Sequence, residues 1–257
     1  MTITSYNPAT GDIVWEGSAT SLSSLDEIVK TSKKGWSEWR KLPLDDRIAY
    51  LVKFGSIVKT RSEELATTIS MEMGKPLWES RQEINAMISK IEISVTAYHK
   101  RCKTQELEIG TRHSITRHMP HGVVVVIAPF NFPAHLPNGH IIPALLAGNV
   151  VIWKSSEYTP FISEKIASIW EEVGLPKGVL TLVHGRSGLG QSLIIHPEVR
   201  GVFFTGSSQV GRTIQSTCLD YPDRILALEM GGNNPLVIGS GIYLYEISIA
   251  LFLGALV

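Results

Sequence analysis

Two polar residues of this 257-residue sequence have neighbours that suit catalysis. Asn131 lies between aromatic and proline residues, in Pro129-Phe130-Asn131-Phe132-Pro133. A rigidly held amide can donate an N–H group to a developing oxyanion, although an asparagine at such a turn can also bond its own backbone. Glu229 follows an apolar stretch and precedes Gly231-Gly232. Partial desolvation there would raise its pKa towards that of a general base, and neutralisation by a nearby arginine or lysine is the equal alternative.

Three further segments could hold a dinucleotide. The first is Lys154-Ser155-Ser156-Glu157, whose carboxylate can accept hydrogen bonds from a ribose. The same carboxylate would repel a 2′-phosphate, which favours NAD over NADP. The alternative is a solvated lysine–glutamate pair without a ligand. In Thr205-Gly206-Ser207-Ser208-Gln209-Val210-Gly211 a glycine turn precedes a predicted helix, whose N-terminal N–H groups attract phosphate. Gly185-Arg186-Ser187-Gly188-Leu189-Gly190 is a weaker cluster of this kind. Either glycine segment could instead be a tight turn.

The cysteines and the remaining histidines are weaker candidates. Cys102 lies in a charged segment far from the predicted strand ends, and Cys218 falls late in a predicted helix, where it would pack in the core. His113, His118 and His121 have a spacing that fits no standard zinc pattern. We therefore expect no metal site.

Composition narrows the class of protein. The 24 basic and 24 acidic residues cancel, so no net charge favours nucleic acid or an anionic membrane as a partner. Two cysteines are too few for a disulfide scaffold, and residues 1–10 lack the basic and apolar regions of a secretion signal, so we expect a cytoplasmic protein. The apolar segment 242–257 is shorter than a membrane span and contains Glu246. We interpret it as core sequence without its partner, with a tail anchor as the alternative.

The first 120 residues predict mainly helices between two hairpins. A turn at Ala9-Thr10-Gly11-Asp12 predicts a hairpin over residues 1–20. Apolar residues at helical spacing then predict helices over 22–39, 45–59, 63–73 and 78–99. Residues 101–120 alternate charged and β-forming residues around Gly110-Thr111, a pattern typical of an exposed hairpin arm.

From residue 121 onwards, short apolar runs alternate with helical patterns. The predicted strands are 122–127, 150–153, 179–183, 201–205 and 224–228, and the predicted helices are 139–147, 161–173, 190–195 and 210–219. Continuous apolar runs indicate strands that are buried on both faces. The sequence therefore predicts an α/β fold with a parallel, doubly wound sheet, in which ligands bind outside the carboxyl ends of the strands.

Five segments, in this order, resemble the aldehyde dehydrogenase superfamily. They are Met73-Gly74-Lys75-Pro76, residues 129–133, residues 154–157, residues 204–211 and residues 228–232. The likeness extends to about Ile238. Within the superfamily, residues 97–101, 117–122, 135–149 and 227–235 are most similar to the branch that oxidises N-succinylglutamate 5-semialdehyde in arginine catabolism.

The resemblance implies an aldehyde-dehydrogenase-like fold and a division of the chain. Residues 1–100 would be the helical part of the cofactor domain, 101–120 an arm that pairs subunits of a homo-oligomer, and 121–238 a Rossmann-like part that binds NAD. Residues 239–257 would be a divergent stub of a catalytic domain that is largely missing. The implied reaction is NAD-dependent oxidation of a small-molecule aldehyde to its carboxylic acid.

The resemblance also implies residue roles. Asn131 would be the oxyanion-hole amide, and Glu229 the base that activates the deacylating water. The implied cofactor contacts are Lys154 and Glu157 at the ribose, Gly206 and Ser207 at the pyrophosphate, Val210 near the adenine, and the glycines Gly185, Gly190 and Gly211.

One departure from the family bears on activity. The family's nucleophilic cysteine lies in a Gly-Gln-x-Cys motif beyond the glutamate, and this sequence has no cysteine after Cys218. We therefore expect this chain alone to be a truncated, inactive fragment that at most binds NAD. A sugar or hydroxy-acid reductase would share the fold, but its Tyr-x-x-x-Lys relay is absent.

Overall fold

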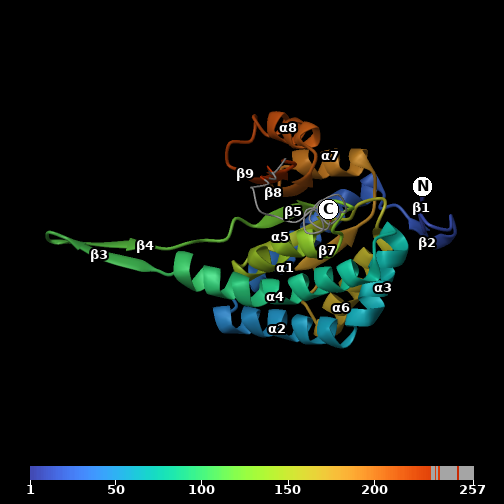
Figure 1. Ribbon diagram of the computed structural model, residues 1–257. Coiled ribbons are helices and arrows are strands. Elements are labelled where there is room, and N and C mark those ends of the chain that lie inside the picture. The colour runs from blue at the N-terminus through green and yellow to red at the C-terminus, as the bar shows by residue number, and fades with distance from the viewer. Residues whose placement is uncertain (233–234, 236, 238–247, 249–257) are drawn as a thin grey trace.

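The structure is a computed structural model that describes residues 1–232, 235, 237 and 248. Nearly all of the predicted stub 239–257, including most of the apolar segment 242–257, lies outside the described residues. Figure 1 shows a layered body from which one long hairpin projects.

The centre of the fold is a parallel sheet of five strands. They are β5 (Val123–Ile127), β6 (Val150–Lys154), β7 (Leu180–Val183), β8 (Val199–Gly206) and β9 (Ile225–Met230), in the order β7-β6-β5-β8-β9. The predicted doubly wound sheet is confirmed. The chain builds outward from β5 to β7 and then returns to β8 on the other side of β5. In parallel sheets, ligands bind at the carboxyl edge where the strand order reverses in this way, which here is the edge at β5 and β8.

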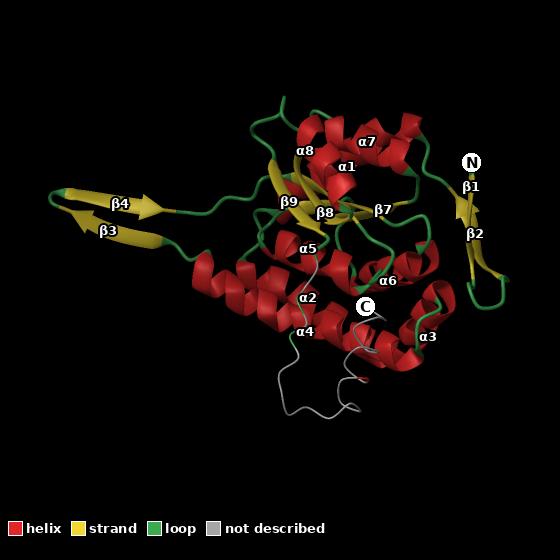
Figure 2. Ribbon diagram, turned by 45° about the horizontal axis from the view of Figure 1, so that its top comes forward, coloured by secondary structure: helices red, strands yellow, loops and turns green. Residues whose placement is uncertain are grey.

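Helices cover both faces of this sheet. On one face lie α1 (Leu25–Trp39), α7 (Ser187–Ile195) and α8 (Ser208–Thr217), and on the other lie α5 (His135–Leu146) and α6 (Pro160–Val173) (Figure 2). A third layer, of α2 (Leu44–Thr60), α3 (Ser62–Met73) and α4 (Leu77–Arg101), packs over α5 and α6. The valines of β5 are therefore fully enclosed, as their uninterrupted apolar run predicts.

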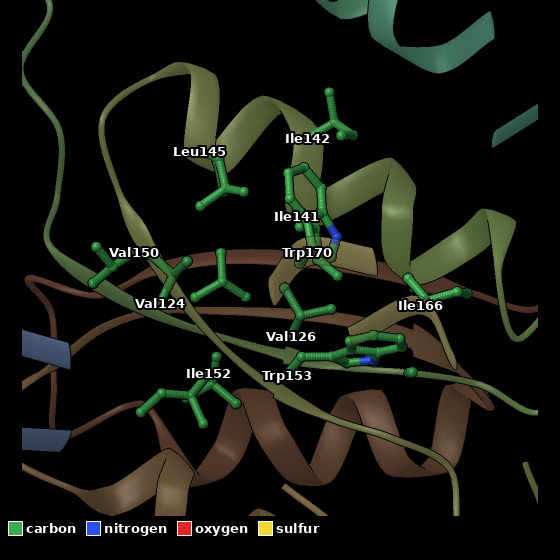
Figure 3. Close-up of a cluster of buried hydrophobic side chains, with 14 of the residues drawn as sticks. Val124, Val126, Ile141, Ile142, Leu145, Val150, Ile152, Trp153, Ile166 and Trp170 are labelled. Atoms are coloured by element: carbon green, nitrogen blue, oxygen red, sulfur yellow. The ribbon is translucent and has the colours of Figure 1, made fainter. Parts of the chain in front are cut away.

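The core between the sheet and the helices is built from large apolar side chains. Figure 3 shows Val124, Val126 and Trp153 of the sheet together with residues of α5 and α6, among them Trp170. The ring of Trp170 stacks on Phe54 of α2, with centroids 3.8 Å apart, which joins the outer helical layer to the inner one. Burying a side chain of this size stabilises the fold by about 1.5–3 kcal/mol.

Two antiparallel hairpins lie outside the sheet. Strands β1 (Thr2–Tyr6) and β2 (Ile13–Ser18) form the first, followed by a short 3₁₀ turn, η1 (Leu22–Ser24). Strands β3 (Gln105–Ile109) and β4 (Arg112–Thr116) form the second, which projects from the body and is exposed along its length (Figure 1). Both predicted hairpins are confirmed.

Several predicted element boundaries are wrong, among them the following three. Helix α5 begins at His135 rather than Gly139, because Pro137 lies in the first turn, where no N–H group is needed, and Glu83 accepts hydrogen bonds from Ala134 N and His135 N. Helix α7 begins at Ser187, so Gly190 lies inside it. Strand β9 extends to Met230, because β8 continues to Gly206 and pairs with it.

Within the described residues, no helix is long and apolar enough to cross a membrane.

Candidate functional site

Strand register places the candidate segments at one edge of the sheet. Ile127, the last residue of β5, pairs with Lys154 on one side and with Phe204 on the other, and Thr205 pairs with Glu229. The loop that carries Asn131 follows β5 directly. The predicted oxyanion donor, general base and cofactor contacts thus share the carboxyl edge, where α/β sheets bind ligands.

Asn131 lies in the loop between β5 and α5 with its side chain exposed. Its backbone carbonyl accepts a hydrogen bond of 3.1 Å from Lys75 Nζ. Within residues 1–232 its side-chain amide makes no hydrogen bond, so the alternative of an asparagine that bonds its own backbone is not observed.

Glu229 lies within β9 rather than after it, and its side chain is exposed. The expected partial desolvation is therefore wrong for this chain: the strand end leaves the carboxylate open to solvent. The alternative, neutralisation by a cation, is not observed either, because no lysine or arginine forms an ion pair with Glu229 among the described residues.

His140 is a neighbour of this site that sequence reasoning missed. Its Nε2 lies 3.0 Å from Thr205 Oγ1, and Thr205 is the sheet partner of Glu229. Burial lowers the pKa of His140, while the charge of Glu229 acts in the opposite direction. A single histidine within a helical pattern carries no signal of this contact, because the contact depends on how α5 crosses β8.

Lys154 and Glu157 form an ion pair at the end of β6, with Nζ 3.0 Å from Oε2. The lysine side chain is 6% exposed and the glutamate side chain 33%. The alternative of a solvated pair is therefore wrong for the lysine, which is buried as the last residue of a central strand. Because the glutamate keeps an open side, the pair presents a carboxylate and an ammonium together, a donor and acceptor set that fits a ribose diol.

The turn after β8 starts helix α8. Ser207 is the N-cap residue, and its Oγ accepts a hydrogen bond from Val210 N. Val210 is exposed on the first turn. The first N–H groups of a helix have no partner within it and attract phosphate, so this turn fits a pyrophosphate. A Cβ at Gly211 would lie 2.4 Å from Met230 Sδ, so this glycine lets α8 approach β9 closely.

Gly185 and Gly190 are buried. A Cβ at Gly185 would lie 2.5 Å from a methyl group of Leu189, and Gly190 faces Ile127 of β5. Close packing against Leu189 thus accounts for Gly185, whereas a Cβ at Gly190, which lies inside α7, would meet Ile127 at an ordinary contact distance of 4.0 Å. A contact of either with a cofactor stays a prediction.

Neither cysteine lies at the carboxyl edge. Cys102 follows the last residue of α4, at the base of the projecting hairpin, and Cys218 is buried at the end of α8. Burial raises the pKa of the Cys218 thiol, which makes it a poor nucleophile. The described part of the chain contains no cluster of three or more histidine, cysteine, aspartate or glutamate residues that could hold a metal.

Known proteins resemble this chain in both sequence and fold. Residues 1–247 match the aldehyde dehydrogenase family. Over 234 residues the chain is 45% identical to N-succinylglutamate 5-semialdehyde dehydrogenase of Burkholderia thailandensis, which covers 91% of this chain and 48% of that protein. The chain therefore spans about half the length of this curated relative.

Solved structures show the same fold. An aldehyde dehydrogenase from Bartonella henselae superposes with a TM-score of 0.91 at 28% identity, over 98% of this chain and 53% of that one. Glyceraldehyde-3-phosphate dehydrogenase from Methanocaldococcus jannaschii, in complex with NADP, superposes with a TM-score of 0.84 at 29% identity, over 91% of this chain and 51% of that one.

Proposed function

Because this chain belongs to the aldehyde dehydrogenase family, we propose that the protein binds NAD at the carboxyl edge of its sheet and serves the oxidation of an aldehyde to a carboxylic acid. The observation that carries the proposal is the register of β5, β8 and β9, from which the Asn131 loop, the Gly206–Ser207 turn and Glu229 extend on one side. The substrate that we propose is N-succinylglutamate 5-semialdehyde, the aldehyde in the name of the relative from Burkholderia thailandensis.

The cofactor would be held at two places. Glu157 and Lys154 would bind the adenosine ribose, and the N-terminus of α8, with Gly206 and Ser207, would bind the pyrophosphate. The relative that was crystallised with NADP shows that the family also uses the phosphorylated cofactor. We choose NAD because the carboxylate of Glu157 would repel a 2′-phosphate. When bound, the nicotinamide accepts a hydride from the substrate.

The protein's own groups would act on the substrate's oxygen and on water. The side-chain amide of Asn131 would donate a hydrogen bond to the aldehyde oxygen as negative charge develops on it. Glu229 would take a proton from the water that releases the acid from a thioester. The thioester needs a cysteine, and neither Cys102 nor Cys218 lies at the carboxyl edge.

An alternative applies to these 257 residues taken alone: they bind NAD without oxidising the aldehyde. The observation that favours it is the lack of a cysteine at the proposed site. We further propose, as for the family, a cytoplasmic homo-oligomer that pairs through the arm formed by β3 and β4.

The test combines binding and turnover. Calorimetric titration of the 257-residue polypeptide with NAD should show one site, which the double variant Glu157→Ala/Ser207→Asp weakens. NADH formation from the semialdehyde should be absent with this polypeptide and present with any longer form that contains the nucleophile. There, Asn131→Ala should lower kcat about 10²–10³-fold. No NAD binding, or an unchanged kcat in Asn131→Ala, would contradict the proposal.

A further inference from the structure

Lys75 is a nearly buried cation whose partners surround the Asn131 loop. It lies in the short connection between α3 and α4, after Gly74, which has a left-handed φ of 73° and ends α3. Its side chain is 10% exposed. A buried ammonium is costly unless charged and polar groups compensate it, so its partners are informative.

Two contacts of Lys75 reach the loop that follows β5. Its Nζ donates a hydrogen bond of 3.1 Å to the backbone carbonyl of Asn131 and lies 4.1 Å from the ring centroid of Phe132. Both are loop residues, more than fifty positions away in sequence. The ammonium therefore holds the peptide unit that carries the proposed oxyanion donor.

Glu83, on α4, contacts both Lys75 and the end of the Asn131 loop. Its side chain is fully buried, and Oε2 lies 2.6 Å from Lys75 Nζ. Its other oxygen, Oε1, accepts hydrogen bonds from Ala134 N at 2.8 Å and His135 N at 3.0 Å. These N–H groups lie at the start of α5, where the helix dipole also favours a carboxylate. Glu79 adds a second carboxylate 3.8 Å from Lys75.

The loop is thus held at two points by one ion pair. Lys75 holds its middle, at Asn131, and Glu83 holds its end, where α5 begins. An oxyanion donor contributes only when it is preorganised, and a displacement of about 1 Å can cost about 10²-fold in rate. We propose that Lys75 and Glu83 are positioning residues that set the place of the Asn131 amide. This inference rests on the proposed function.

The first test measures how firmly the loop is held and needs no enzymatic reaction. In Lys75→Met the aliphatic stem remains and the ammonium is removed. Amide hydrogen exchange of residues 130–135 in the 257-residue polypeptide should become at least tenfold faster, while α6 and the sheet stay protected. Lys75→Arg, which can still donate to both oxygens, should restore most of the protection. Lys100→Met, an exposed lysine further along α4, is the matched control and should change nothing.

The second test measures kcat and KM in a catalytically active form of the protein. There, Lys75→Met and Glu83→Gln should lower kcat about 10–100-fold with KM nearly unchanged, because substrate binding does not depend on the oxyanion donor. Lys75→Arg should recover much of kcat. If Lys75→Met fails to fold, Glu79→Gln, which weakens the network without removing the ammonium, gives the same readouts on a smaller scale.

The outcomes separate this inference from the proposed function. Unchanged exchange at residues 130–135 in Lys75→Met would overturn the inference, whatever the protein catalyses. Faster exchange with an unchanged kcat would also overturn it, provided that Asn131→Ala does lower kcat. If Asn131→Ala leaves kcat unchanged, the proposed function itself fails, and the exchange data then report only how the loop is held.

Discussion

Lys154 Nζ and Glu157 Oε2 lie 3.0 Å apart at the carboxyl end of β6, with the lysine buried and the glutamate partly open. The lysine is the last residue of β6, and its ion pair holds one oxygen of the carboxylate. A carboxylate held in this way can bind two adjacent hydroxyl groups and disfavours a phosphate at the same place. In the proposed function, the choice between NAD and NADP would depend on this one carboxylate.

Replacement of this carboxylate should shift cofactor preference. Glu157→Gln is expected to weaken NAD binding about tenfold or more, since hydrogen bonds to a charged group contribute about 1.5–3 kcal/mol, and to reduce the discrimination against NADP. Titration calorimetry with both nucleotides measures the two affinities. Glu171→Gln, an exposed glutamate on α6, is the control and should bind like the wild type. An unchanged ratio of NAD to NADP affinity in Glu157→Gln would refute the role of this carboxylate.

Ser207 has one observed role and one proposed role, which substitutions can separate. As the N-cap of α8 it accepts the Val210 N–H, so Ser207→Ala should lower the free energy of unfolding by about 1 kcal/mol. Ser207→Asp keeps a capping oxygen and should retain stability, yet its charge should repel the pyrophosphate and weaken NAD binding more than alanine does. Urea denaturation and NAD titration of the two variants are the measurements. Aspartate that binds NAD as well as serine would count against a phosphate site here.

Glu72 should make stability depend on pH. Burial raises its pKa from 4.5 to about 6, against the opposing hydrogen bonds from Ile162 N and Phe161 N. Between pH 4.5 and 6 the folded state holds the proton that the unfolded state has lost, so the free energy of unfolding falls as pH rises. The contribution is complete below 4.5, is lost above 6 and amounts to something on the order of 2 kcal/mol.

The measurement is urea denaturation of the wild type and of Glu72→Gln from pH 4 to 7, at about half-unit steps. All other groups titrate equally in both proteins, so the difference between the two curves reports Glu72. The free energy of unfolding of Glu72→Gln, relative to that of the wild type, should increase as pH rises from 4.5 to 6. Two parallel curves would show that Glu72 titrates alike in the folded and unfolded states.

Gly178 should not tolerate a side chain. Its φ is +84°, and a Cβ would lie 2.4 Å from the backbone oxygen of Thr31, which cannot move aside as a side chain can. Gly178→Ala should therefore destabilise the fold by about 2–4 kcal/mol. Gly188→Ala is the matched control: this glycine lies in α7 with nothing near its Cβ position, and alanine there should stabilise by up to about 1 kcal/mol. Melting temperatures that move together in both variants would contradict this expectation.

The sequence by itself determined the fold class and the segments that meet at the site. The uninterrupted valines of β5, the alternation of strand and helix after residue 121, and the glycine that ends α3 are local patterns, each with a local physical cause. Because the carboxyl ends of parallel strands share one edge, the same patterns also predict that the Asn131 loop and the β8 turn lie together.

Only the tertiary structure decided which side chains are buried, which of them are paired, and which residues are their partners. Lys154 is enclosed and Glu229 is open, although both directly follow a predicted strand. Lys75 reaches the site from the connection between α3 and α4, and Glu83 and His140 reach it from α4 and α5. Sequence spacing reports neighbours along one element, whereas these contacts depend on how separate elements cross, which packing of the whole core determines.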